Sequence, residues 1–376
     1  MKQLLIIAFV WPEPNSTAAG NRMLQLIHFF LENAYQITIA STAAESNLSM
    51  DLESLGIQKA TIQLNHASFD EFVANLNPEI VLFDRFLTEE QFGWRVTEYA
   101  PKALRVLDTE DLHSLRRARE KCFKAGNPFS KDKWLQNDMT KREIASIYRS
   151  DFSLIISSYE MELLTDVIHM DESLLLHLPF MLNGITKEAI QAWPDFDARQ
   201  DFLCIGNGKH TPNIDAIVWL KKEIWPLIRK GLPKANLNVY GAYLPEHIKQ
   251  MHKPSEGFLV HGWAKNKDEV FQSARINLAP LQFGAGIKGK LIDAMQAGTP
   301  SITTKIGAEG MHDTLAWCGS IAEDAESFAQ AAISFYQDKN NWTRAQRNGI
   351  AIVNQLYAKK KLNPQFLNRL QWLSTN

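Results

Sequence analysis

The sequence predicts an α/β protein made of two doubly wound domains, and two observations carry this prediction. Short apolar runs alternate with helical stretches, as expected for buried parallel strands joined by helices. The alternation occurs twice, and 376 residues are too many for one ordinary hydrophobic core. We therefore expect a first domain at 1–182, a linker at 183–200, a second domain at 201–361 and a C-terminal helix at 362–376.

Apolar runs mark the expected strands of both domains. After the first run, an amphipathic helix is predicted, with one face made of Met23, Leu24, Ile27, Phe30 and Leu31. The expected strands are 4–11, 36–41, 60–64, 79–84, 103–108 and 152–157 in the first domain, and 201–206, 237–241, 257–262, 276–281 and 301–304 in the second.

The segments outside the strands are less regular. A helical stretch is expected at 213–228. The segment 181–200 combines Gly, Pro and mixed charge without a clear period, which indicates a linker. Residues 363–373 have the pattern of a short amphipathic helix, which could pack on either domain.

Composition excludes several classes of protein. The hydrophobic content of 45% is globular, and the net charge of −2 gives no general signal for nucleic acid. Cys122, Cys204 and Cys318 fit neither a disulfide framework nor a zinc spacing, so no metal is expected. The apolar run 4–11 is short and leads into Pro12, so we interpret it as a strand rather than a signal peptide. We expect a cytoplasmic protein, with peripheral attachment at the inner face of the membrane as an option.

The stretch LAPLQFGAGIKGKLIDAM, at 278–295, is the most informative for function. Gly284 stands before four residues and the pair Gly289-Lys290, which is almost a P-loop. Leu291 stands where an NTPase needs Ser or Thr to bind Mg²⁺. We therefore expect the loop to hold a phosphate group without a required metal.

The same stretch offers groups for a whole nucleoside diphosphate. Gly284 and Gly286 allow close approach of a ligand, and Lys288 and Lys290 flank the start of a helix. Asp293, about one turn further, suits the hydroxyls of a ribose. The alternative is a capped amphipathic helix with surface lysines.

Three other loops follow expected strands, and ligands of α/β sheets bind at such ends. Gly20 opens the first helix and could offer a backbone N–H to an anion. The turn GNGKHTPN, at 206–213, lacks the third Gly of a dinucleotide-binding motif, which disfavours a dehydrogenase. The candidate ligand-binding residues of this turn are Asn207, Gly208 and Lys209. In the loop at 261–266, Gly262 and Trp263 are expected to contact a nucleobase.

These motifs together resemble a known family. Residues 200–312, above all APLQFGAGIKGKLIDAMQAGTPSITTKIGAEGM, resemble the C-terminal domain of the retaining glycosyltransferase family 4, also called glycosyl transferases group 1. The resemblance implies the GT-B fold: two Rossmann-like domains facing a central cleft, with a C-terminal helix that crosses back to the first domain. It also implies transfer of a sugar from a nucleoside diphosphate sugar, with UDP or GDP as the nucleotide, with retention and no required cofactor.

The resemblance implies a role for each matching residue. Lys290 and Lys209 would neutralise the departing diphosphate, and Asp293 would replace the family's ribose-binding Glu. His113 would face the transferred sugar, and Gly20 would contact the diphosphate. The donor sugar and phosphates would be lined by Gly284, Ala285, Gly286, Ile287 and Lys288.

Two departures from the family pattern keep an alternative open. Ala285 stands where the family has its first Glu, and Asn207 is the polar residue where an Arg is usual. The chain could thus be a degenerate relative that binds a nucleotide or a partner without turnover. A sugar-nucleotide epimerase is a weaker alternative, since few histidines are suitably placed: His113, His210 and His261.

The acceptor is expected to bind the first domain. Asp111 and Arg116 follow a strand and could bind an acceptor hydroxyl, although Asp111 could equally cap a helix. The segment 116–149 holds ten Lys or Arg against four acidic residues. This segment could contact anionic lipid, or it could be a solvated helix. The expected acceptor is a glycan, a lipid-linked sugar or another cell-envelope molecule, and no nucleic acid is expected.

Overall fold

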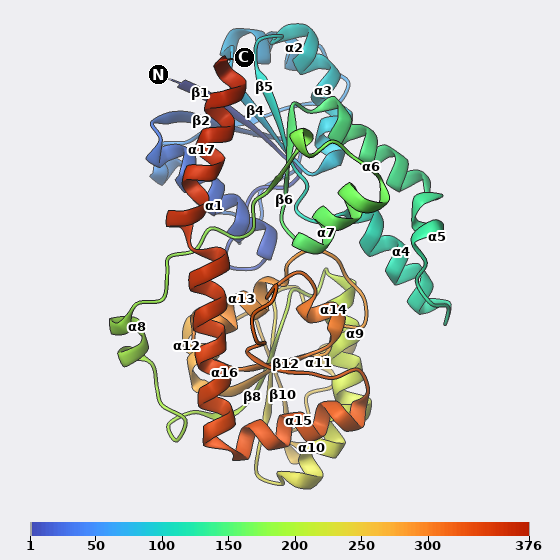
Figure 1. The fold of residues 1–376 in the computed structure, drawn as a ribbon, viewed down its shortest axis with the longest axis vertical. Coiled ribbons are helices and arrows are strands. Elements are labelled where there is room, and N and C mark those ends of the chain that lie inside the picture. Colours follow the sequence, from blue (N-terminus) through green and yellow to red (C-terminus); the bar gives the residue numbers. More distant parts are fainter. Residues whose placement is uncertain (1, 376) are drawn as a thin grey trace. The chain divides into compact units, whose positions relative to one another are not determined.

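The chain forms two compact units in a computed structural model that describes residues 2–375. The first unit comprises the chain up to Pro14, Ala19–Met181 and the chain from Lys359 onward. The second comprises Asn15–Ala18 and Leu182–Ala358. Each unit has one sheet whose paired strands are parallel, with helices packed around it (Figure 1). The α/β fold predicted from the sequence is confirmed.

The first unit is built on a seven-stranded sheet of order β3-β2-β1-β4-β5-β6-β7. Its strands are β1 Lys2–Ala8, β2 Tyr35–Ser41, β3 Gln58–Thr61, β4 Ile80–Asp84, β5 Leu104–Asp108, β6 Phe152–Ile155 and β7 Leu175–His177. Its helices are α1 Ala18–Glu32, α2 Ser68–Leu76, α3 Phe86–Tyr99, α4 His113–Lys124, α5 Lys131–Leu135, α6 Asp138–Arg149, α7 Ser158–Glu162 and α17 Lys359–Thr375. The order in which successive strands are added to the sheet reverses between β1 and β4. Ligands of such sheets bind at this position.

The second unit has a six-stranded sheet of order β10-β9-β8-β11-β12-β13. Its strands are β8 Gln200–Ile205, β9 Leu237–Tyr240, β10 Phe258–Gly262, β11 Ala274–Ala279, β12 Ser301–Thr303 and β13 Gly319–Ile321. Its helices are α8 Lys187–Ala192, α9 Thr211–Trp219, α10 Trp225–Gly231, α11 Glu246–Lys249, α12 Lys267–Ser273, α13 Gly289–Gln296, α14 Lys305–Ala308, α15 Ala325–Gln337 and α16 Lys339–Ile352. Here the reversal lies between β8 and β11.

The C-terminal helix α17 packs on the first unit. Phe366 is fully buried, stacks on Phe29 of α1 at 4.5 Å between ring centroids and meets Phe30 edge-on at 5.7 Å. This contact resolves the alternative left open by the amphipathic pattern at 363–373. The helix begins at Lys359, slightly before the expected boundary at 362.

Several boundaries differ from those expected. The strand expected at 4–11 ends at Ala8, because the next N–H, of Phe9, donates to Asp84 Oδ2 at 2.9 Å instead of continuing the ladder. The three-residue strands β7 and β13 were not predicted, since runs this short carry no pattern. The expected helix at 213–228 is divided by a π-helical segment, Leu220–Ile224, and the expected linker contains α8. Among the described residues, no helix is both long and apolar enough to cross a bilayer.

Candidate functional site

The candidate donor residues of the second unit follow adjacent strands of its sheet. Asn207, Gly208 and Lys209 follow β8, Gly262 and Trp263 lie at the end of β10, and the glycine-rich loop follows β11. Strand β9 lies between β8 and β10, and β11 pairs with β8. The sheet thus brings these loops to one edge, at the reversal of strand order where α/β proteins bind ligands.

Lys290 lies in the first turn of α13, and Asn213 of α9 fixes its amine. The amine donates to Asn213 Oδ1 at 2.6 Å, and Asn213 Nδ2 donates to the carbonyl of Asn207 at 2.9 Å. Gly206 leaves room for this arrangement, since a Cβ there would lie 2.8 Å from Lys290 Nζ. Burial lowers the pKa of Lys290 to about 8, so the amine is mostly charged at neutral pH. A cation is therefore held beside a helix N-terminus.

The glycine-rich loop differs from expectation at Lys288. Its amine turns back to the carbonyl of Gly286 at 2.7 Å, and the residue is buried. Gly286 has φ 63°, a conformation that favours glycine. Ile287 is also buried, while Ala285 is partly exposed. Lys288 therefore stabilises the loop in this structure, and Lys290 carries the charge at the helix start.

Lys209 occupies a more open position. Its side chain is exposed, and its amine lies 3.7 Å from the centroid of the Tyr243 ring. Asn207 Oδ1 accepts from the backbone N–H of Lys209 at 2.8 Å. Gly208 has no space for a side chain, because a Cβ would lie 2.2 Å from the carbonyl oxygen of Tyr243. The turn is thus shaped by close packing of the β8 and β9 loops.

The segment Asn15–Ala18, which belongs to the second unit, contacts two of the candidate residues. Trp263 Nε1 donates to the carbonyl of Asn15 at 3.3 Å, and Asn207 Nδ2 donates to that of Ser16, also at 3.3 Å. Gly262 has φ 83°, so it permits the sharp turn that ends β10.

Asp293 lies one turn beyond Lys290 and forms an ion pair. Lys267 Nζ is 2.8 Å from Asp293 Oδ1. Burial raises the pKa of Asp293, and the Lys267 ammonium opposes this effect. A carboxylate can accept several hydrogen bonds, so the ion pair leaves capacity for a ribose hydroxyl.

The candidate residues of the first unit form a separate group after β5. His113 Nε2 lies 3.2 Å from Asp111 Oδ1, and Arg116 Nε donates to Asp111 Oδ2 at 2.7 Å. Burial lowers the pKa of His113 to about 4, so its imidazole is neutral at physiological pH. Asp111 does not cap α4, because Glu143 accepts the N–H groups of His113 and Ser114 at 2.8 and 3.1 Å.

Gly20 has a structural reason to be glycine. A Cβ at this position would lie within 2.4–2.6 Å of the backbone of Glu13. The close approach of these two segments explains the residue without a ligand. Its predicted contact with a diphosphate stays a prediction.

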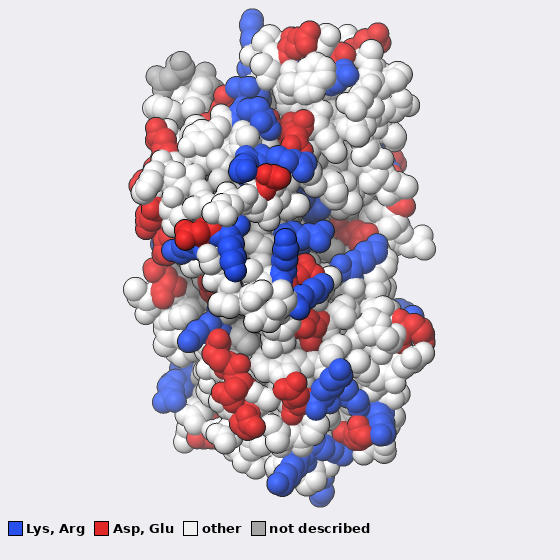
Figure 2. Space-filling model, turned by 90° about the vertical axis from the view of Figure 1, so that its right-hand side faces the viewer, with Lys and Arg blue, Asp and Glu red and all other residues white. Residues whose placement is uncertain are grey.

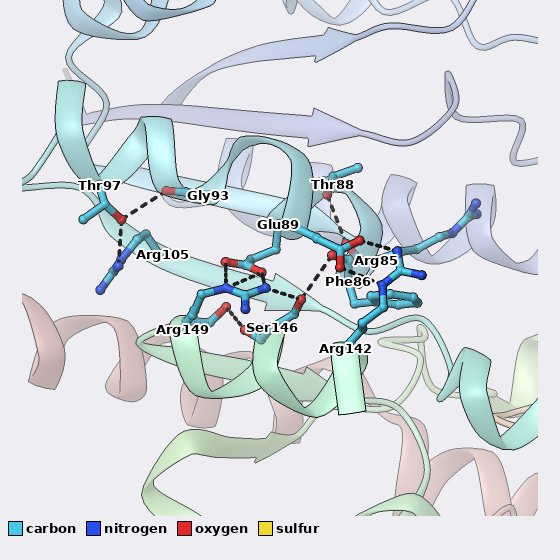
Figure 3. A network of polar contacts seen from close by, with 12 residues as sticks. Arg85, Phe86, Thr88, Glu89, Gly93, Thr97, Arg105, Arg142, Ser146 and Arg149 are labelled. Atoms are coloured by element: carbon cyan, nitrogen blue, oxygen red, sulfur yellow. Dashed lines mark hydrogen bonds and ion pairs between the residues drawn. The ribbon is translucent and has the colours of Figure 1, made fainter. Parts of the chain in front are cut away.

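The basic segment at 116–149 is partly neutralised. Figure 3 shows Arg149 of α6 bound to Glu89 of α3, where Nη2 donates to Oε2 at 2.6 Å. Arg142 of the same helix donates its Nε to Glu90 Oε1 at 2.7 Å. Basic and acidic side chains are interspersed on the face drawn in Figure 2. Exposed cations remain on α4, where Arg117 is one example.

Sequence reasoning missed several residues that hold the site together. The two glycines of the turn at 206–213 are expected from the sequence to let the backbone approach a ligand, but the sequence does not show that the missing side chain of Gly206 makes room for the pair of Asn213 and Lys290. Tyr243 and Lys267 lie on other elements and contact candidate residues only after folding. No spacing along the chain could have indicated those two contacts.

Comparisons with known proteins agree with this arrangement. The model of the family "Glycosyl transferases group 1" matches residues 199–338. An uncharacterised 44.6 kDa protein in the cps region of Klebsiella pneumoniae is 25% identical over 167 residues. That match covers 43% of each chain, so this chain aligns with less than half the length of its curated relative.

Solved structures show the same fold over the whole chain. A sucrose-phosphate synthase from Thermosynechococcus elongatus superposes with a TM-score of 0.73 at 15% identity, covering 99% of both chains. The pneumococcal O-GlcNAc transferase GtfA, in complex with UDP and GlcNAc, gives 0.72 at 11% identity and covers 100% of this chain and 99% of that one. Residues 199–338 therefore match the glycosyl transferases group 1 family, and the whole chain shares the two-unit α/β fold of these solved structures.

Proposed function

We propose that the protein transfers a sugar from a nucleoside diphosphate sugar to a hydroxyl of a glycan, a lipid-linked sugar or another cell-envelope acceptor. The observation that carries the proposal is Lys290, a cation fixed by Asn213 at the N-terminus of α13 and at the reversal point of the sheet. A departing diphosphate needs positive charge at such a place. The bound UDP of the pneumococcal structure supports the class of donor.

The proposed chemistry follows from where charge develops. As the glycosidic bond breaks, the diphosphate becomes more negative and the sugar acquires oxocarbenium character. A fixed donor aimed at the leaving group is typically worth about 3–4 kcal/mol of barrier. Lys290 and the first N–H groups of α13 supply such donors without a metal ion. Retention would follow if the acceptor attacks on the face that the diphosphate leaves, with a phosphate oxygen as base.

The remaining donor residues have roles matched to their chemistry. Asp293 would bind the ribose hydroxyls, and the turn at Gly262 and Trp263 would contact the nucleobase. The backbone of the loop 284–288 would line the sugar and phosphates. Lys209 is a weaker candidate for the diphosphate, because its amine already rests on the Tyr243 ring.

The first unit is proposed to bind the acceptor. Asp111 and Arg116 stay predicted contacts, and the neutral imidazole of His113 could accept or donate a hydrogen bond to a sugar. We also propose peripheral contact with anionic membrane lipid through 116–149, at the cytoplasmic face. The exposed cations of α4, such as Arg117 and Lys121, support this contact, whereas the paired Arg142 and Arg149 would not take part.

One observation favours a second function. Ala285 replaces the first Glu of the family pattern, so the protein could bind a nucleotide without transferring a sugar. Turnover of a nucleotide sugar would separate this alternative from the proposed transferase.

The decisive first test is a thermal-shift panel of nucleoside diphosphates and nucleotide sugars, with Lys290→Ala beside the wild type. A ligand at about 100 times its Kd stabilises the folded state by about 2.7 kcal/mol, which is readily visible. We expect one nucleotide to stabilise the wild type and to have little effect on the variant. Lys222→Ala is the control, because Lys222 is exposed in the same unit. Equal stabilisation of all three proteins would remove Lys290 from the donor site.

A further inference from the structure

The start of α12 carries a lysine that lies beside the proposed donor residues of α13. Lys267 is the first residue of α12, and it follows the loop of Gly262 and Trp263, which is proposed to contact the nucleobase. Its amine lies 2.8 Å from Oδ1 of Asp293, in the second turn of α13. This ion pair joins the segment proposed for the base to the helix whose first turn holds Lys290.

Packing between the two helices places this pair. Phe271 is fully buried and follows Lys267 by four residues, so both lie on one face of α12. Ala294, next to Asp293, is fully buried in the same apolar cluster as Phe271, and its small side chain lets α12 lie beside α13 (Figure 1). Asn266 fixes the start of α12, because its Oδ1 accepts two N–H groups of the first turn at 3.1 and 3.3 Å. Since α12 follows β10, its first residue lies at the same edge of the sheet as the donor loops.

The pair retains capacity to bind a ligand. An ammonium has three donors and a carboxylate accepts several hydrogen bonds. Within residues 2–375, however, each of these side chains has one hydrogen bond, the one that joins Lys267 to Asp293. Both side chains also reach solvent, since 28% of Lys267 and 18% of Asp293 are exposed. Ion pairs that reach solvent contribute little to folding stability, so stability alone does not account for this one.

The position of the pair matches the order of groups in a nucleotide. The ribose of a nucleotide joins its base to its phosphates, and the ion pair likewise lies between the base loop and the helix that begins beside Lys290. Each of the two ribose hydroxyls can donate one hydrogen bond and accept others. Because Oδ1 of Asp293 is engaged by Lys267, its Oδ2 is left to accept from one hydroxyl. The adjacent ammonium can donate to the oxygen of the other hydroxyl.

We propose that Lys267 is a further donor-binding residue, which donates to one hydroxyl of the nucleotide ribose while Asp293 accepts from the other. This inference rests on the proposed function, because it concerns the nucleoside diphosphate of that reaction. The pair then requires both hydroxyls at once. It selects a ribonucleotide against a deoxyribonucleotide such as dTDP.

The test is isothermal titration of the full chain with UDP and GDP, and then with the 2′-deoxy and 3′-deoxy forms of the nucleotide that binds. The variants are Lys267→Met and Asp293→Asn, which nearly keep the size of each side chain. We expect each variant to bind the ribonucleotide about tenfold or more weakly than the wild type, because each loses a charged hydrogen-bonding group. The loss in Lys267→Met should disappear with one deoxy form, and the loss in Asp293→Asn with the other.

Lys221→Met is the matched control. Lys221 forms a similar ion pair in the same unit: its amine lies 2.7 Å from Glu256 Oε2, and its side chain is 18% exposed. Glu256 precedes β10, whereas Lys267 follows this strand, so the control pair lies at the opposite end of β10. We expect the control to bind every nucleotide as the wild type does. Thermal melting of all variants verifies that they are folded.

Three results would overturn the inference while the proposed transferase function stands. Wild-type affinity in Lys267→Met would exclude a contact with the nucleotide. An equal loss for the ribonucleotide and both deoxy forms would assign Lys267 to the phosphates or to the fold of the site. If both losses disappear with the same deoxy form, Lys267 acts only through Asp293. If neither UDP nor GDP binds the wild type, the inference and the proposed function fail together.

Discussion

The substitution Gly206→Ala should disable the donor site by adding a single methyl group. The new Cβ would lie 2.6 Å from Cγ and 2.8 Å from Nδ2 of Asn213, and 2.8 Å from Nζ of Lys290. Such distances are too short for non-bonded atoms, so one of the two side chains must move. Gly206 does not have a positive φ, so alanine fits its backbone and the effect comes from the clash alone.

Two costs follow from this displacement. Overpacking a filled site typically costs about 1–3 kcal/mol of folding free energy. The 2.6 Å bond from Lys290 to Asn213 involves a charged donor, and such bonds contribute about 1.5–3 kcal/mol. If Lys290 loses this anchor, we expect the affinity for a nucleoside diphosphate to fall roughly 10- to 100-fold.

Isothermal titration with UDP and GDP, together with thermal melting, measures both effects. Gly231→Ala is a matched control, because its Cβ would lie 2.7 Å from Cδ1 of Ile333, away from the candidate residues. We expect the control to lose some stability and no affinity. Wild-type affinity in Gly206→Ala would refute the argument that the space at Gly206 positions Lys290.

Three other predictions concern charge and packing. The affinity of the wild type for the diphosphate, measured by titration from pH 7 to 9.5, should fall above pH 8 by up to tenfold per pH unit. The reason is that the Lys290 amine, with a pKa of about 8, loses its charge there. The affinity of Lys290→Met should not depend on pH in this range. Asp293→Asn should weaken binding of UDP about tenfold but leave binding of its 2′,3′-dideoxy analogue unchanged, whereas equal losses would remove Asp293 from the ribose. Phe366→Ala should destabilise the protein by about 3–5 kcal/mol in urea unfolding, because Phe366 is fully buried against Phe29; a loss below about 1 kcal/mol would mean that α17 contributes little.

The sequence predicted the fold from local signals and the donor loop from a motif. The run at 4–11, most of which lies in β1, is apolar throughout. A strand that is buried on both faces of a sheet has this composition. The loop before Lys290 was visible because glycines, lysines and Asp293 are close together in the sequence. Short strands such as β7 were missed, because three residues cannot show a period.

The contacts that set the chemistry of each residue could not be predicted from local patterns in the sequence. Lys288 and Lys290 are two residues apart and appeared equivalent as phosphate ligands. In the structure Lys288 binds its own loop at Gly286, while Lys290 reaches Asn213 on another helix. Likewise, Asp111 was a candidate cap for α4, but Glu143 has that role from α6.

The sequence by itself therefore determined the number of units, the type of their sheets and which loops carry charge, because these depend on the order of apolar, polar and glycine residues along the chain. Only the tertiary structure decided which charges are free to meet a ligand. Asn213 and Lys290 are far apart in the sequence and share no motif, yet parallel pairing of β8 with β11 brings the helices that follow these strands together. The reason is physical: a charge's partners are set by distance in space, and the sheet fixes that distance independently of separation along the chain.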